Sequence, residues 1–347
     1  MPGTATAKPP ADGARGSLPD TFFDGLLVVA FGGPEGKDDV MPFLENVTRR
    51  RNVPRERLEE VAEHYARFGG MSPINAQNRA LIAALGPELD AHGIDLPIYL
   101  GNRNWHPFLE DTIREMQADG VTRALAFIAG AYSSYSSCRQ YRENVVDAQT
   151  AVGQGAPEVL RLRAFYNHPG FVEANVEHVQ AALAGLPGAH VAFTAHSIPG
   201  AMASRSRYES QLAETARLVA ERVGARDHAV VYQSRSGSPR VPWLEPDVCD
   251  HIRSLPERGV EAVVVSPVGF VSDHMEILFD LDVEAREAAA AAGLGFARAQ
   301  TAGTHPAFVA MIRELIQERL DPDVPRRALG RFGPSHDICL AGCCLPR

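Results

Sequence analysis

The sequence predicts an α/β protein with two doubly wound domains, each holding a four-stranded parallel sheet flanked by helices. Short apolar runs rich in β-branched residues alternate with longer stretches of helical periodicity, which is typical of a parallel sheet covered by helices. This pattern runs through the chain twice, and 347 residues exceed the usual size of one domain. In each half, the third apolar run leads into a polar loop and then into a long helix.

Eight strands are expected, and each is bounded by glycine, proline or polar turn residues. In chain order they cover 26–31, 97–100, 124–128, 159–165, 191–194, 229–232, 262–265 and 295–299. The helical stretches between them include 72–92, 108–118, 206–223 and 274–291. Ligands of such sheets bind beyond the carboxyl ends of the strands, so residues that directly follow a strand are the first candidates for function.

The chain divides into four segments. Residues 1–21 are rich in Pro, Gly, Ala and Thr and lack an apolar centre, so we expect a disordered leader rather than a signal peptide. Residues 22–166 and 167–321 are the two expected domains. Residues 322–347 are rich in proline and carry three of the five cysteines, so we expect a tail that packs on the first domain.

Composition narrows the functional classes. A net charge of −9 argues against a nucleic-acid partner, because the field of the whole protein repels a polyanion. No apolar stretch approaches the roughly 18 residues of a membrane span. Without an export signal, we expect a cytoplasmic protein whose thiols stay reduced. We also expect a monomer.

Two segments that follow strands of the second half carry the strongest chemical signals. His196 ends the run HVAFTAH and is suited to act as a base or as a neutral metal ligand; a capping or core histidine is the alternative. After the seventh strand, Glu276, Asp280 and Glu284 recur every four residues, so a helix places them in one stripe. Their mutual repulsion favours a bound cation over a merely solvated acidic face. Both segments leave the same predicted sheet, so His196 and Glu276 could reach one crevice.

The loops of the first half combine aromatic, hydroxyl and guanidinium groups. Phe31 precedes a glycine pair that lacks the spacing of a dinucleotide-binding loop. Arg49, Ser72 and Tyr141 lie in later loops or at helix starts. Such groups suit a flat apolar ligand that carries carboxylates, because guanidinium pairs bidentately with carboxylate. Ordinary loop packing with a basic surface turn is the alternative.

Together these segments resemble the ferrochelatase family over residues 23–320. The resemblance is carried by LLVVAFGGPEG, FGGMSPIN, GNRNW, FTAHSIP, VVYQSRSG and VGFVSDHMEILFDLD, in matching order. It implies two Rossmann-like domains of chelatase type with a porphyrin between them. It also implies an enzyme that inserts Fe²⁺, its metal substrate, into the porphyrin on the way to haem, with release of two protons.

The resemblance also implies roles for individual residues. The invariant histidine of the family matches His196, its metal-site glutamate matches Glu276, and its acidic relay matches Asp280 and Glu284. In the coproporphyrin-using bacterial branch, residues that contact the propionates match Ser72, Tyr141 and, nearby, Arg49.

One position departs from the family pattern, and the sequence leaves more than one substrate and function possible. Many bacterial relatives have tyrosine where this chain has Phe31, which lies in the porphyrin site but cannot ligate iron. Coproporphyrin III is the expected substrate and coprohaem the product, with protoporphyrin IX as the alternative. A cobalt or nickel chelatase and a non-catalytic haem or metal carrier are the further alternatives.

The cysteines suggest a second metal site. Cys339, Cys343 and Cys344 crowd the tail, and a four-thiolate site needs one more ligand, either Cys138 or Cys249. Some ferrochelatases hold a [2Fe–2S] cluster with one cysteine from mid-chain and three near the C-terminus, which implies Cys138 here. Zinc in the same site, or thiols that bind nothing, are the alternatives.

Overall fold

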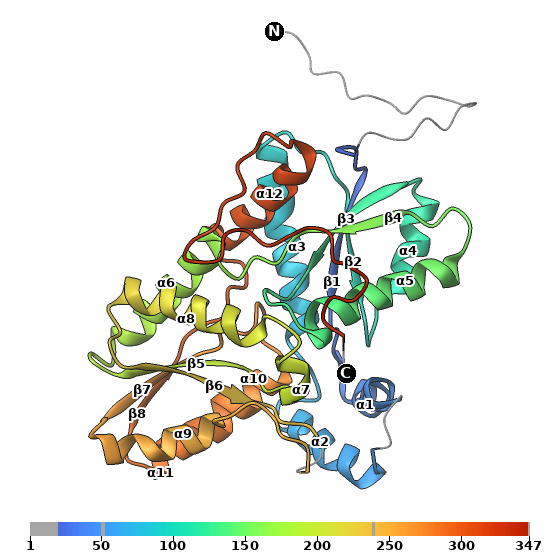
Figure 1. The fold of residues 1–347 in the computed structure, drawn as a ribbon. Helices are drawn as coiled ribbons and strands as arrows, with labels where there is room; N and C mark the ends of the chain where they lie inside the picture. The colour runs from blue at the N-terminus through green and yellow to red at the C-terminus, as the bar shows by residue number, and fades with distance from the viewer. Residues whose placement is uncertain (1–19, 50–52, 238–239, 346–347) are drawn as a thin grey trace, which may run out of the picture.

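The computed structural model describes residues 20–49, 53–237 and 240–345. Most of the expected leader 1–21, and Arg50 and Arg51 of the basic turn, lie outside the described residues. Each half of the chain holds one four-stranded parallel sheet with helices packed around it (Figure 1). The strand orders are β2-β1-β3-β4 and β6-β5-β7-β8, so the second sheet repeats the topology of the first. The predicted fold class is confirmed.

The strands lie close to their expected positions. Those of the first sheet are β1 (Gly25–Ala30), β2 (Ile98–Asn102), β3 (Arg123–Ile128) and β4 (Glu158–Arg161). Those of the second sheet are β5 (His190–His196), β6 (His228–Gln233), β7 (Ala262–Ser266) and β8 (Gly295–Arg298). The largest error is β4, which ends at Arg161 instead of reaching residue 165. Leu162 and Phe165 are apolar because they enter the core, and they do so without pairing to a strand.

Helices connect the strands in both halves. The first half has α1 (Val40–Thr48), α2 (Arg55–Arg67), α3 (Ile74–Ala91), α4 (Leu109–Ala118) and α5 (Gln140–Val152). The second has α6 (Pro169–Leu183), α7 (Gly200–Ala203), α8 (Tyr208–Val223), α9 (Val248–Ser254), α10 (Met275–Phe279), α11 (Arg286–Ala291) and α12 (Pro306–Leu320). Among these described helices, none is both long and apolar enough to cross a bilayer.

The helix expected over 274–291 is not continuous. A π-helical segment, Asp280–Ala285, separates α10 from α11. A second π-helical turn, Tyr135–Arg139, precedes α5 in the polar loop after β3. Sequence spacing did not reveal either segment, because apolar residues three or four apart fit an α-helix and a short π-helical insertion equally well.

One apolar core joins the two halves. The rings of Phe127 and Phe165 stack 5.3 Å apart, and Phe308 of α12 packs edge-on against both at 6.2 and 5.9 Å. Helix α12 also packs against α3 of the first half and α6 of the second. This shared core fixes the two sheets relative to each other, and with them the loops that follow their strands. We propose that the domain boundary lies at 166–167.

The tail after α12 contains no helix or strand within its described part, 321–345. It runs back across the molecule in dark red (Figure 1). Arg331 pairs with Glu214 of α8 at 2.9 Å, so this part of the tail contacts the second half. Further along, Arg142 of α5 donates to the Cys339 carbonyl at 3.4 Å, so the tail ends on the first half.

Candidate active site

His196 is held at the carboxyl end of β5 with one ring nitrogen engaged. Its Nδ1 lies 2.5 Å from the carbonyl oxygen of Ser197. A carbonyl oxygen only accepts hydrogen bonds, so Nδ1 carries a proton, and in the neutral imidazole the lone pair is on Nε2. The Tyr208 hydroxyl donates to the backbone carbonyl of His196 at 2.9 Å and fixes the end of the strand. The free lone pair therefore has a defined direction.

Glu276 faces that lone pair. Its Oε2 lies 3.7 Å from Nε2 of His196, and both side chains remain partly open, with 31% and 49% of their surfaces exposed. Glu276 is the second residue of α10, which begins at Met275 after the loop that leaves β7. Burial and the nearby Glu276 carboxylate raise the pKa of Tyr65, so this phenol stays protonated. The pair can accept a proton or bind a cation, as the sequence suggested for residues at this edge of the sheet.

Asp280 lies one turn behind Glu276 and is held by two consecutive residues, the last of β6 and the one that follows it. The Ser234 hydroxyl donates a short hydrogen bond to its Oδ2, and Gln233 Nε2 lies 3.4 Å from the same oxygen. Burial, followed by the charge of Glu276, raises the pKa of Asp280 to about 8. Without a cation, this carboxyl group is mostly protonated at neutral pH.

The π-helical segment keeps the three carboxylates in line. Four residues of an α-helix overshoot one turn by about 40°, which moves Asp280 to one side of Glu276. A π-helix closes its hydrogen bonds over five residues, so its turn is wider and the next four residues fall short of one turn. Glu284, inside Asp280–Ala285, is thereby rotated back toward the line of the other two.

Glu284 is the outermost of the three. Burial and the carboxylates of Asp247 and Glu287 raise its pKa, while Arg253 and Arg67 oppose this shift. Both arginines come from other helices, so the spacing of the carboxylates gave no sign of them. The stripe thus runs from the exposed Glu284, through the half-buried Asp280, to the His196–Glu276 pair.

An apolar cluster borders the site on the side of α1 and α2. Phe43 is its centre, with ring centroids of Phe31, Tyr65 and Trp105 at 6.3, 6.1 and 6.0 Å. Met275, which precedes Glu276, is buried in the same cluster. These rings join the first half of the chain to the acidic stripe of the second.

Arg103 is a site residue that the sequence analysis did not single out. It follows β2 within the quoted motif GNRNW, and its guanidinium lies 5.7 Å from the ring centroids of both Phe31 and Tyr141. Cation–π contact of this kind brings the two predicted aromatic residues to one cation. Arg103 directly follows the second strand, so its position in the sequence was a signal of a functional residue.

Ser72 and Arg49 lie in different surroundings. Ser72 is buried against Gly33, where a Cβ atom would come within 2.7 Å of the serine Cβ, so only glycine fits. Arg49 is exposed where α1 ends. The structure therefore joins Phe31 and Tyr141 through Arg103, while Ser72 packs on the loop after β1 and Arg49 points into solvent.

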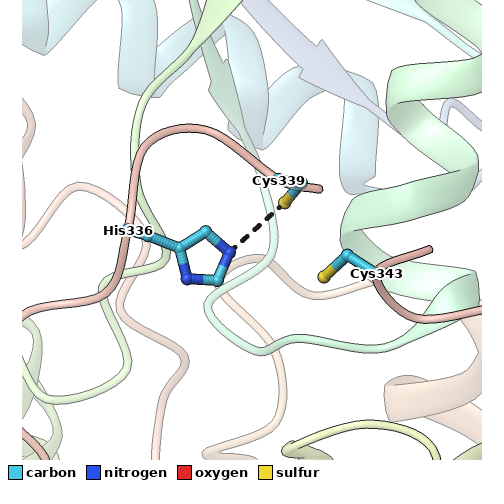
Figure 2. Close-up of side chains that lie close together, drawn as sticks. All are labelled: His336, Cys339 and Cys343. Atoms are coloured by element: carbon cyan, nitrogen blue, oxygen red, sulfur yellow. Dashed lines mark hydrogen bonds between the residues drawn. The ribbon is translucent and has the colours of Figure 1, made fainter. Parts of the chain in front are cut away.

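The four cysteines predicted to bind a cluster converge at the end of the tail. The Cys343 and Cys344 sulfurs lie 3.6 Å apart. The Cys344 thiol donates to Cys138, which is buried in the π-helical turn before α5, and lowers the pKa of Cys138 to about 6. Cys339 and Cys343 form a compact group with His336, with the ligand atoms of all three within 4.8 Å of one another (Figure 2). His336 was not among the predicted residues.

Three arginines hold the backbone of this loop. Arg139 donates to the carbonyls of Ala341 and Cys343 at 2.7 Å, and Arg161 donates to the carbonyls of His336 and Asp337 at 3.1 Å. Arg142 donates to the Cys339 carbonyl, as noted above. Positive charge of this kind favours thiolates and suits a metal site.

Cys249 has a different environment. It lies in α9, where burial, followed by the charges of Asp247 and Glu284, raises its pKa to about 12. Its thiol is therefore protonated and packs against the apolar residues between α9 and the second sheet.

Comparison with known proteins agrees with this geometry. The family model described as ferrochelatase matches residues 23–320. A ferrochelatase of Rhodopirellula baltica is 56% identical over 93% of both chains. A coproporphyrin III ferrochelatase of Nocardia farcinica is 52% identical, covering 93% of this chain and 97% of its own. A similar enzyme of Streptomyces coelicolor is 51% identical over 95% and 96%.

Solved structures support the fold. The sirohydrochlorin chelatase SirB of Bacillus subtilis subspecies spizizenii, solved with cobalt, superposes with a TM-score of 0.53 at 10% identity, covering 87% of this chain and 97% of its own. SirB of Bacillus subtilis with Fe³⁺ gives 0.51 at 14% identity, covering 86% and 97%. The family model covers both sheets and the acidic stripe. The first two relatives are 52–56% identical to this chain over 93% of its length. The chain therefore belongs to the ferrochelatase family, enzymes that insert a metal into a porphyrin.

Proposed function

We propose that this enzyme inserts Fe²⁺ into coproporphyrin III and yields coprohaem. The observation that carries the proposal is the distance of 3.7 Å between His196 Nε2 and Glu276 Oε2. Both residues lie at the carboxyl ends of strands of the second sheet. The names of relatives at 51–52% identity favour coproporphyrin III over protoporphyrin IX. The reaction belongs in the cytoplasm, where ferrous iron and thiols stay reduced, and a monomer contains all the residues it needs.

His196 and Glu276 divide the chemistry of metal insertion. Two pyrrole N–H protons must leave as Fe²⁺ binds the four ring nitrogens, so the overall charge balances. The unprotonated Nε2 of His196 accepts the two ring protons one after the other and passes each to water, and the carboxylate of Glu276 attracts the metal to the same place. Because the two groups are partly exposed, a porphyrin and an ion can both reach them.

Asp280 and Glu284 supply the metal. A cation that enters at Glu284 meets Asp280 next, and it displaces the proton that burial holds there. The proton released from Asp280 leaves along the same stripe. The stripe therefore holds either a proton or the metal ion at Asp280. In both states the three adjacent carboxylates are never all negatively charged without a cation.

The porphyrin lies against the aromatic cluster of Phe31, Phe43 and Trp105. Its propionates are bound by Ser72, Tyr141 and Arg49, as in the coproporphyrin-using branch. Coproporphyrin III has four propionates where protoporphyrin IX has two. Each charge-assisted hydrogen bond contributes roughly 1.5–3 kcal/mol, so the substrate with more carboxylates is held more tightly. Phe31 offers no oxygen to the iron, so it contributes packing alone.

Cys138, Cys339, Cys343 and Cys344 hold a [2Fe–2S] cluster in this proposal. The residues fit the group: four sulfurs converge, and three arginines hold the backbone of the loop. A bound cluster can carry an electron. The cysteines themselves cross-link the tail to the turn before α5, which stabilises the fold.

An anaerobic metalation assay tests the substrate. Initial rates with Fe²⁺ are compared for coproporphyrin III and protoporphyrin IX, and then for Co²⁺ and Ni²⁺ with coproporphyrin III. We expect the highest kcat/KM for Fe²⁺ with coproporphyrin III. An equal or higher value with protoporphyrin IX would refute the substrate assignment, faster turnover with Co²⁺ or Ni²⁺ would refute the metal, and binding without turnover would indicate a carrier.

A further inference from the structure

The tail brings together one ligand more than a [2Fe–2S] cluster uses. Such a cluster has four terminal ligand positions. Five side chains converge here, because His336 joins the four cysteines. We propose that His336 is not a ligand but donates a hydrogen bond to the Cys339 sulfur, and that this bond raises the reduction potential of the cluster. The inference rests on the cluster proposed above.

The geometry places the imidazole directly against one sulfur. Nε2 of His336 lies 3.5 Å from Sγ of Cys339, a distance suited to an N–H···S hydrogen bond (Figure 2). Two arginines hold the turn that carries the imidazole. Arg161 donates to the His336 carbonyl at 3.1 Å, and Arg326 pairs with the Asp337 carboxylate at 2.9 Å. The imidazole thus approaches Cys339 from an anchored turn.

Ligand chemistry and burial together indicate which of the five groups stays outside the ligand set. Iron–sulfur clusters are held by cysteine thiolates, and the four cysteines supply the four positions. Cys138 and Cys344 are buried, while His336 is exposed, so the imidazole can stay solvated beside the cluster. The ligand set is therefore the four cysteines, with His336 as their neighbour.

A hydrogen bond to a cluster sulfur has a predictable effect. Reduction adds negative charge to the cluster and its sulfurs. A donor that points at one sulfur stabilises this charge, so the reduced form is favoured and the reduction potential rises. The arginines of the loop donate to backbone carbonyls, so their contacts differ in kind from that of His336.

Two variants and one control test the inference on the full-length protein. His336→Ala removes the donor, and His336→Gln retains an N–H group on a side chain of similar reach. His92→Ala is the control, because His92 is an exposed histidine directly after α3 whose ring nitrogen contacts a backbone carbonyl at 2.8 Å. Iron and sulfide content, the visible spectrum and the reduction potential are measured for each anaerobically purified protein.

We expect full iron and sulfide content in all three variants. The potential should shift downward in His336→Ala, less so in His336→Gln, and not at all in His92→Ala. Loss of the cluster in His336→Ala would overturn the inference, because it would make His336 a ligand. An unchanged potential would overturn it as well. A wild-type protein without iron and sulfide would instead refute the cluster itself, and the role of His336 with it.

Discussion

The Ser234 hydroxyl donates a short hydrogen bond to Oδ2 of Asp280, and Ser234 adopts a left-handed backbone conformation, with φ of 60°. Non-glycine residues rarely adopt this conformation, and it costs on the order of 1–3 kcal/mol. The hydrogen bond favours the ionised carboxylate, but burial and Glu276 outweigh it, so the pKa of Asp280 rises to about 8. The carboxyl group is thus held in place as an acid that a cation can deprotonate.

Asp280→Asn should change how stability depends on pH. The folded-state pKa of Asp280 is above its unfolded value of about 4, so folding favours the protonated form. Its contribution to stability is complete below pH 4 and is lost as the pH rises to about 8. The asparagine variant lacks this loss, so above pH 8 it should be the more stable protein, by no more than about 5 kcal/mol.

Urea denaturation without metal, from pH 4 to pH 9, measures this difference. Asp95→Asn serves as the control, because Asp95 is an exposed carboxylate. Its stability curve should run parallel to that of the wild type. If the curve of Asp280→Asn also runs parallel, then the Asp280 pKa is not raised in the folded protein.

Ser234→Gly and Ser234→Ala separate the hydroxyl from the backbone. Both variants lose the hydrogen bond to Asp280, but glycine adopts a positive φ freely while alanine does not. We expect both to lower kcat/KM for Fe²⁺ by roughly tenfold, the effect of losing a hydrogen bond to a charged group. The glycine variant should be the more stable of the two, by about 1 kcal/mol, because it relieves the left-handed strain that serine and alanine share. A glycine variant with wild-type kcat/KM would show that the hydroxyl does not contribute to metal delivery.

Much of the fold could be predicted because it depends on local patterns. The repeated alternation of strands and helices gave two sheets, and their strand orders are the same. Residues that are buried without pairing to a strand are harder to predict. Leu162 and Phe165 are apolar because they enter the core, so β4 is shorter than the apolar run suggested.

The site could be predicted only in part, because spacing along the chain does not reveal contacts between distant segments. His196 and Glu276 were expected near each other, since both follow strands of one sheet, and they lie 3.7 Å apart. Ser234 also follows a strand, but its role depends on a left-handed conformation that the residue type does not favour. The π-helical segment likewise leaves no mark in the spacing of the carboxylates.

His196→Ala should abolish iron insertion while porphyrin binding survives. The variant loses the unprotonated Nε2, whereas the aromatic cluster and the propionate contacts remain. Porphyrin binding is measured by fluorescence quenching and turnover by the loss of porphyrin absorbance. Near-normal turnover in folded His196→Ala protein would exclude His196 as the base.

Glu276→Gln should also lose most of its turnover, because the charge beside Nε2 disappears while the shape of the side chain is kept. Asp280→Asn and Glu284→Gln, which are further from Nε2, should retain more activity. The losses are compared at limiting and saturating Fe²⁺. A larger loss for Glu284→Gln than for Glu276→Gln would contradict the proposed order of metal transfer.

Serine substitution of the cysteines should distinguish the cluster ligands from Cys249. Cys138→Ser removes the ligand that ties the tail to the turn before α5, so the protein should lose its colour and its iron and sulfide. Cys249→Ser is the matched control, because its protonated thiol packs in α9 beside Asp247 and Glu284. This variant should keep the colour of the wild type.

The same variants report what the cluster does. If it cross-links the tail to the first half, Cys138→Ser should lower the midpoint of thermal unfolding, and proteolysis should then begin in the segment after α12. Serine at Cys339, Cys343 or Cys344 should have the same effect, because each breaks the same link. Zinc bound without sulfide would show that the four sulfurs hold a mononuclear metal. Bleaching by Cys249→Ser alone would show that the fourth ligand is Cys249, and that the contact between Cys138 and Cys344 serves packing only.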